Sequence, residues 1–331
     1  MSGMALKDVN KIPETEKINE SSNNGNFMKP HLEQVDENVE NRENKRIASL
    51  LETPNLRDGS ENSGEGVANS EVEYIESEKL EDVEDVEDCL KTLLLGLGSK
   101  DWVSVCDALN NVRRLSIFHK EDIACMLNDV ISLIVKSLKN PRSAVCKTAI
   151  MTSADIFKAY NDDMIDSLDP LLVQLLLKSS QDKRFVCEAA ESALITLTNW
   201  VSPLSLLPKL QPHIKNRNPR IRAKASMCIS RSVPRLGVDG IEEFGIDKLI
   251  QIGASQLSDQ LPESRDAART LLLELQSAYE KSHLLETTAA VSEEPSTVSW
   301  ELFCQSKLSP LSAQAVLRVT SIPREGFVSS S

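Results

Sequence analysis

A short pattern recurs through the middle of this 331-residue chain at intervals of about 40 residues. Each copy has a basic residue on a polar, turn-forming segment, followed by small and branched apolar residues at helical spacing. The clearest copies are KNPRSAVCKTA (139–149), DKRFVCEAA (182–190), RNPRIRAKA (217–225) and LPESRDAA (261–268). The small residues Ala108, Ala149, Ala190, Ala225 and Ala268 align with spacings of 41, 41, 35 and 43 residues. A fixed period of this length indicates a stack of similar units, each of which buries its apolar face against its neighbours.

The repeating units read as pairs of helices. Apolar residues return at helical spacing from about residue 83 to residue 281, and no alternating strand with a hairpin turn interrupts them. Aromatic residues make up only 4% of the chain, which suits packed helices better than a β-sandwich. A period near 40 with two helices per unit is typical of HEAT and armadillo repeats. We therefore predict an all-α solenoid of about five HEAT/armadillo-like helix pairs over residues 81–282.

The segments on either side of this array differ from it in composition. Residues 1–88 carry 9 Lys and Arg against 23 Asp and Glu, a net charge of −14, whereas residues 89–282 carry 25 against 22, a net charge of +3. Residues 1–80 are poor in apolar side chains, so we expect an acidic, disordered N-terminal segment. Residues 283–331 are expected to be a mostly disordered tail, in which SPLSAQAVLRV (309–319) could form a short amphipathic helix.

Several classes of function find no support in the sequence. The four histidines are scattered without paired spacing, so we expect no enzyme activity, no metal site and no cofactor or small-molecule substrate. The seven cysteines form no CxxC pair and read as free thiols in a reducing compartment. No secretory signal and no apolar stretch of membrane-spanning length is found. A net charge of +3 without an aromatic series also argues against nucleic-acid binding.

The turns inside the helix pairs should line up along one edge of such a solenoid. SKDWVSVCDAL (99–109) places a tryptophan after an acidic residue on the first turn, and this array resembles a TOG domain of the type found in CLASP proteins. The resemblance covers roughly residues 82–282. It implies a tubulin-binding role for the residues that match the family's turn positions: Trp102, Arg142, Lys183, Arg184, Arg217, Arg220 and Arg265. Trp102 could equally be a core residue of the first pair, and the resemblance favours the contact role.

One feature departs from the family. TOG domains usually have six repeats, and five are counted here. A sixth would need residues 283–320, where TTAAVSEEPSTVS predicts no regular structure.

A second, short motif lies near the C-terminus. Thr320, Ser321, Ile322 and Pro323 fit the pattern [ST]-x-I-P, which resembles the peptide that docks on end-binding proteins at microtubule plus ends. Arg318 and Arg324 supply the basic surroundings that such peptides favour, and Glu325 weakens them. The competing interpretation is a stub of helix or strand that packs on the array.

The sequence thus predicts a non-enzymatic, cytoplasmic, cytoskeletal protein that binds tubulin or microtubules through a basic ridge of turns. Tubulin is acidic, so a row of Lys and Arg would gain charge-assisted hydrogen bonds and steering. End-binding proteins would be a further partner through the TSIP motif. The alternative is an armadillo/HEAT scaffold that binds a different protein or peptide. The acidic N-terminal segment could also fold over the ridge and compete with tubulin, or serve only as a solubilising tail.

Overall fold

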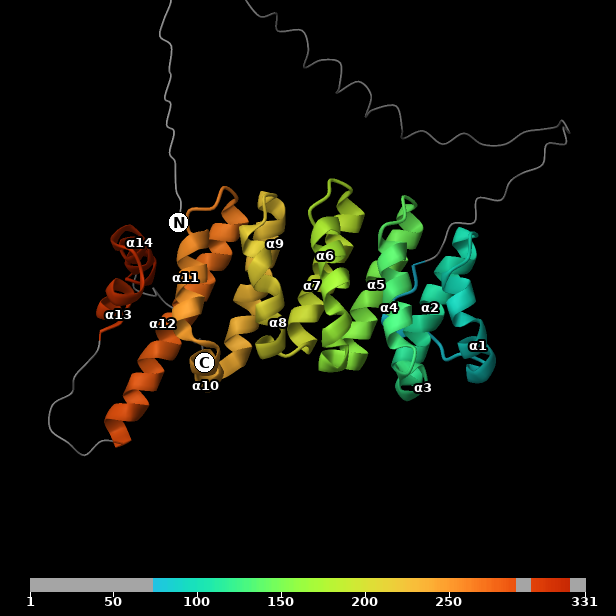
Figure 1. The fold of residues 1–331 in the computed structure, drawn as a ribbon, viewed down its shortest axis with the longest axis horizontal. Coiled ribbons are helices and arrows are strands. Elements are labelled where there is room, and N and C mark those ends of the chain that lie inside the picture. The colour runs from blue at the N-terminus through green and yellow to red at the C-terminus, as the bar shows by residue number, and fades with distance from the viewer. Residues whose placement is uncertain (1–73, 290–298, 322–331) are drawn as a thin grey trace, which may run out of the picture. The chain divides into compact units, whose positions relative to one another are not determined.

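The computed structural model describes residues 74–289 and 299–321, which form helices and short connections without a β-strand. The α-helices stand side by side in a row (Figure 1). Five pairs follow one another: α1 (Val86–Leu97) with α2 (Trp102–Phe118), α4 (Leu127–Leu138) with α5 (Ser143–Tyr160), α6 (Leu168–Lys178) with α7 (Arg184–Trp200), α8 (Pro203–Leu210) with α9 (Pro219–Ser232), and α11 (Ile246–Gln256) with α12 (Pro262–Ala289). The predicted all-α solenoid of about five helix pairs is confirmed.

Shorter helices lie between the pairs, except that one, Gln211–Lys215, lies within the fourth pair between α8 and α9. The α-helices α3 (Lys120–Ala124) and α10 (Gly237–Phe244) precede the second and fifth pairs, and 3₁₀ helices occupy Asn161–Ser167, Gln211–Lys215 and Val233–Leu236. Prolines begin α8, α9 and α12, where their missing N–H costs little because the first turn of a helix leaves its N–H groups unbonded in any case.

The second helices of the pairs, α2, α5, α7, α9 and α12, pack against one another in succession. The aligned alanines lie in these helices and are all buried: Ala108, Ala149, Ala190, Ala225 and Ala268. Gly96 plays a similar part in the first pair, because a Cβ placed there would stand 2.9 Å from the Cβ of Ala108. Small side chains at these points therefore permit the close helix approach that the period predicts.

The C-terminal tail differs from the prediction of a mostly disordered segment. Helix α12 continues to Ala289, and residues after 298 form α13 (Trp300–Lys307) and α14 (Pro310–Thr320), which pack on α11 and α12. Trp300 is buried, and its ring centroid lies 5.4 Å from that of Tyr279 in α12. These helices are stabilised by tertiary contacts, because a few of their aromatic side chains pack on an apolar surface at the end of the array.

The N-terminal boundary also shifts. The expected disordered segment ends at residue 80, yet the described chain begins at Tyr74 and runs over α2 and α5 before α1 starts. Ser77 begins a 3₁₀ turn that ends at Lys79, Leu80 is buried, and Asp82 lies 2.8 Å from His119 at the end of α2. We call residues 74–82 the N-terminal strap. The expected disorder of residues 1–73 lies outside the described residues.

Candidate functional site at the turn edge

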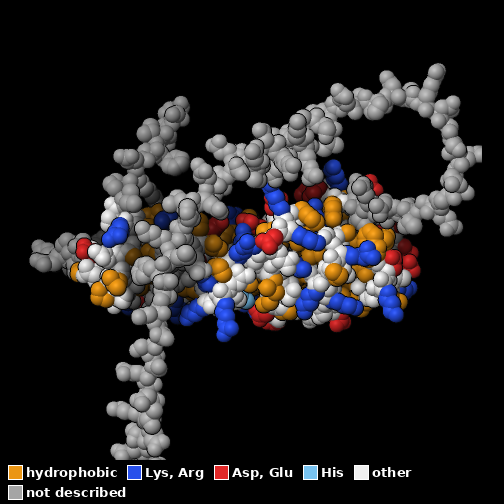
Figure 2. Space-filling view, turned by 90° about the horizontal axis from the view of Figure 1, so that it is seen from above, with side chains coloured by type: hydrophobic (Ala, Val, Ile, Leu, Met, Phe, Trp, Pro, Cys, Tyr) orange, Lys and Arg blue, Asp and Glu red, His pale blue; other side chains and the backbone are white. Residues whose placement is uncertain are grey.

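One turn connects the two helices of each pair. The five turns lie along the upper edge of the row in Figure 1. We call this the turn edge and define it by residues 98–101, 139–142, 179–183, 216–218 and 257–261, each counted together with the first four residues of the helix that follows. Figure 2 looks onto the molecule from that side and shows Lys and Arg side chains together with acidic and apolar ones. The surface is therefore mixed in charge where the sequence predicts a basic ridge.

On the first turn, Asp101 is the N-cap residue of α2. Its carboxylate accepts hydrogen bonds from the backbone N–H groups of Val103 and Ser104, and the bonds from Ser104 hold the pKa of Asp101 below its usual range. Trp102 follows as the first residue of α2. Its ring is partly exposed and packs against the core, and the guanidinium carbon of Arg142 on the second turn lies 5.2 Å from the ring centroid. Trp102 thus serves packing and remains accessible at the edge.

On the third turn, Lys183 and Arg184 are both exposed but point to different partners. The ammonium of Lys183 donates to the hydroxyl of Ser143 at the start of α5, over 3.2 Å. The guanidinium of Arg184 forms an ion pair with Glu188 one turn along α7, at 2.7 Å, while 89% of the side chain stays exposed. An exposed pair of this kind is weak, so Arg184 remains available to a partner.

The arginines of the fourth and fifth turns fall into two groups. Arg217 is exposed, and its guanidinium has no partner among the described residues. Arg220 instead reaches back to the third turn, where it binds the Asp182 carboxylate at 2.5 Å and the Ser180 carbonyl at 3.2 Å. Arg265 is half-buried and donates to two carbonyls of its own turn, those of Asp259 and Gln260.

Asp182 lies directly before the N-cap residue of α7. Lys183 holds that position, and no side chain caps the helix. The Asp182 carboxylate is drawn to Arg220 of the next repeat instead. Asp182 thus forms an ion pair with Arg220 of the next repeat and no cap hydrogen bond to α7.

Arg222 on α9 is a turn residue that the sequence analysis missed. Its guanidinium forms an ion pair with Asp259 on the fifth turn at 2.6 Å and donates to the Asn216 carbonyl at 2.9 Å. Each neighbouring pair of turns is thus joined by one basic side chain. These contacts, the turn bridges, are Arg142 with Trp102, Lys183 with Ser143, Arg220 with Asp182, and Arg222 with Asp259. The basic residues that recur on the turns therefore also have a structural role, because they hold neighbouring turns together.

The structure places only part of the TSIP motif. Thr320 is the last residue of α14 and is buried, and its hydroxyl accepts a hydrogen bond from the Trp300 indole N–H at 3.1 Å. Ser321 follows as the C-cap residue of α14. Ile322 and Pro323 lie outside the described residues.

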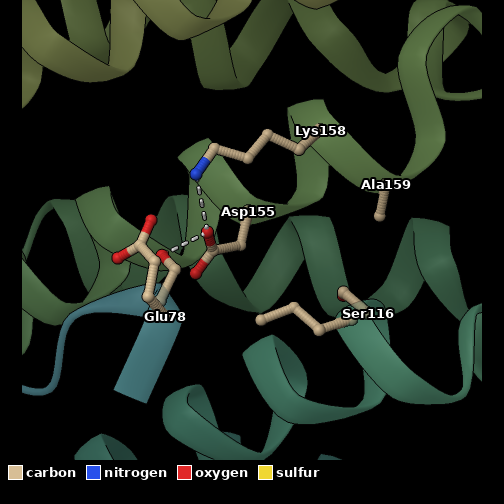
Figure 3. Close-up of a pocket in the computed structure, with 7 residues that line it drawn as sticks. Glu78, Ser116, Asp155, Lys158 and Ala159 are labelled. Carbon is tan, nitrogen blue, oxygen red and sulfur yellow. Dashed lines mark hydrogen bonds and ion pairs between the residues drawn. The ribbon is translucent and has the colours of Figure 1, made fainter. Parts of the chain in front are cut away.

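A separate cavity of about 330 Å³ lies beside the N-terminal strap, at the ends of α2 and α5 that are remote from the turn edge (Figure 3). Its lining includes Ser77, Ser116, Asp155 and Lys158. The Asp155 carboxylate there already accepts a hydrogen bond from Ser77 at 2.7 Å and lies 3.7 Å from the Lys158 ammonium. The Asp155 carboxylate is thus committed to contacts within the fold.

Two further observations concern the described residues. They contain no group of three or more His, Cys, Asp or Glu side chains that could hold a metal ion. None of their helices combines the length and the apolar character needed to cross a membrane.

Comparison with known proteins finds sequence relatives that are named as regulators of microtubules. No family model matches. The mouse "TOG array regulator of axonemal microtubules protein 1" is 26% identical over 180 residues, covering 53% of this chain and 10% of that protein. The human protein of the same name is 31% identical over 107 residues, covering 32% of this chain and 6% of that protein. The chain therefore spans only a small part of the length of these relatives.

A solved structure shows the same fold. A chain from "Structural Basis of Microtubule Plus End Tracking by XMAP215, CLIP-170 and EB1" superposes with a TM-score of 0.52 at 16% identity, covering 73% of this chain and 94% of that one. The finer likeness to CLASP proteins stays a prediction. The predicted resemblance to TOG domains is confirmed: this helical array is similar in sequence to TOG array regulators of axonemal microtubules and shares the fold of a solved plus-end-tracking chain.

Proposed function

We propose that this chain is a microtubule-associated binding module that holds tubulin against its turn edge. The observation that carries the proposal is the edge itself. Five successive turns present the Trp102 ring under Arg142 at the first and second turns, and the exposed cations Lys183, Arg184 and Arg217 at the third and fourth. Sequence similarity to proteins named as regulators of axonemal microtubules supports the same partner and a cytoskeletal location. The module binds and does not catalyse.

Contact and positioning roles are divided among the predicted site residues. Trp102, Arg142, Lys183, Arg184 and Arg217 present exposed atoms and are proposed as tubulin contacts. The guanidinium groups of Arg220 and Arg265 donate hydrogen bonds to neighbouring carboxylate and carbonyl oxygens, so we assign these residues to positioning the turns. Charge-assisted hydrogen bonds to an acidic partner would then come chiefly from the second, third and fourth turns.

The experiment compares two charge reversals at opposite ends of one helix. Arg217 directly precedes α9, whereas Arg231 is an exposed cation in its last turn, away from the turn edge. The full chain is run by size-exclusion chromatography with unpolymerised tubulin, at low and moderate salt. Co-elution should be lost for Trp102→Ala, Arg217→Glu and the double variant Lys183→Glu/Arg184→Glu, and kept for Arg231→Glu. Co-elution that survives all the turn-edge changes would exclude this surface, and absence of co-elution for the unchanged chain would favour the alternative scaffold function.

A separate proposal is that end-binding proteins recruit the chain through the TSIP motif, which consists of Thr320, Ser321, Ile322 and Pro323. This proposal requires a local change in the structure. An extended docking peptide that includes Thr320 requires the last turn of α14 to unwind and the Trp300–Thr320 hydrogen bond to break. Binding of an end-binding protein domain should therefore strengthen in Trp300→Phe, which lacks the indole N–H, and disappear in Ile322→Asn/Pro323→Asn. If the unchanged chain and Trp300→Phe both fail to bind, the motif is not a docking peptide.

A further inference from the structure

Phe185 stands out on the surface of α7. The buried stripe of this helix consists of Val186, Ala190, Ala193, Leu194 and Leu197. Phe185 lies off that stripe, and 43% of it is exposed to solvent. Its neighbours on the same outward side, Glu188 and Ser192, are polar and exposed. The array therefore gains little from an aromatic ring at this position.

The surroundings of Phe185 relate it to the turn edge. It is the second residue of α7, directly after Lys183 and Arg184, and the backbone N–H of Val186 bonds the Lys183 carbonyl in the first turn of that helix. The side chains of the two preceding cations are directed to Ser143 and Glu188. A large apolar side chain with cationic neighbours is the composition of an interface hot spot, in which an aromatic anchor is desolvated and charged groups surround it.

We infer that Phe185 is an apolar anchor for tubulin on the third turn, a second aromatic contact besides Trp102. The inference rests on the proposed function and deepens it, because it states that the turn edge binds through apolar burial as well as charge. Burial of the exposed part of the Phe185 side chain on complex formation gives a favourable contribution comparable to about a tenfold change in affinity.

The chain offers a matched control on the same helix. Trp200 is the last residue of α7 and is 49% exposed, at the edge opposite the turns. Both are half-exposed aromatic side chains at an end of one helix, and they differ in which edge they occupy. The measurement is the affinity of each full-chain variant for fluorescently labelled, unpolymerised tubulin, with circular dichroism to confirm that each variant is folded.

Phe185→Ala should weaken binding about tenfold, and Trp200→Ala should leave it within about twofold. Phe185→Leu, which keeps an apolar side chain, should recover most of the affinity. Phe185→Lys separates apolar anchoring from charge: it should weaken binding, whereas an edge that acts through charge alone would bind more tightly at low salt.

The two levels of the proposal can fail separately. Unchanged affinity in Phe185→Ala, together with a loss in Trp102→Ala, would overturn the anchor and leave the tubulin-binding function in place. Equal losses in Phe185→Ala and Trp200→Ala would also overturn it, because the effect would not be confined to the turn edge. If the unchanged chain does not bind tubulin, the proposed function fails and the anchor fails with it.

Discussion

Arg113 and Asp155 form a buried ion pair inside the array, where the N-terminal strap crosses α2 and α5. Arg113 Nε lies 2.7 Å from Asp155 Oδ2, and both side chains are almost fully buried. The remaining groups are satisfied by Asn110, which accepts from Arg113 at 3.2 Å, and by Ser77, which donates to Asp155 at 2.7 Å. A buried pair is tolerated only with such additional hydrogen bonds, since both charges have lost their hydration.

Removal of one partner should therefore be costly. Arg113→Met removes the closer counter-charge of the buried Asp155 carboxylate and leaves only the half-exposed Lys158 ammonium at 3.7 Å. We therefore expect the free energy of unfolding in urea to fall by about 3–5 kcal/mol. The double variant Arg113→Met/Asp155→Leu removes both charges and should recover most of that loss. Equal losses in the two variants would show that packing, and not the unpaired carboxylate, sets the cost.

The cysteines differ in access to solvent, which gives a second prediction at this scale. Cys89, Cys106, Cys146, Cys228 and Cys304 are buried and Cys187 is partly buried, whereas Cys125, between α3 and α4, is exposed. Burial raises the pKa of Cys228 to about 12 and that of Cys304 to about 11, so both stay protonated and unreactive near neutral pH.

A thiol reagent such as DTNB should therefore modify about one thiol quickly in the folded protein and the rest only after unfolding. Cys125→Ser should abolish the fast phase, and Cys228→Ser should leave it intact. A fast phase of several thiols in the unchanged chain would contradict the burial of these side chains.

At the scale of elements, the sequence predicts the helix pairs because each helix carries its own signal. The apolar face of α1 runs from Val86 to Leu97 at helical spacing, and its residues are buried or packed against the core. In the tail, only α14 carries such a signal, in the amphipathic segment 309–319. Helix α13 is short, and its key contact, Trp300 with Tyr279, joins segments 21 residues apart. Among site residues, turn positions could be predicted from the repeat, but the choice between exposed and bridging arginines depends on the neighbouring turn.

Helices α13 and α14 should depend on Trp300. The side chain is buried against α12 and bonds Thr320, so Trp300→Ala removes a large apolar surface and leaves a cavity, at a cost of about 3–5 kcal/mol. Hydrogen exchange should show faster exchange of the α13 and α14 amides, with smaller changes in α5 and α7. Leu302→Ala on the same helix, where the side chain is 57% exposed, should change little. Unaltered protection in Trp300→Ala would mean that other contacts hold the pair.

At the scale of the whole molecule, the turn bridges connect stability to recognition. Each repeat contacts mainly its neighbours, so the spacing of the turns is set pair by pair along the array. Four basic side chains fix that spacing at the edge where tubulin is proposed to bind. A partner that touches several turns at once needs them in register, so a bridge can influence binding without a contact of its own.

Asp182→Asn tests this coupling. Asp182 and Arg220 are 90% and 54% exposed, so loss of their solvent-screened ion pair should change the free energy of unfolding little. Tubulin affinity should nevertheless fall several-fold, and by no more in the double variant Asp182→Asn/Arg220→Gln, because either change alone opens the same bridge. The control is Asp266→Asn, which breaks an exposed ion pair with Arg269 inside α12. If Asp182→Asn and Asp266→Asn have equal effects on affinity, the change reflects net charge, and the bridges act only in the stability of the array.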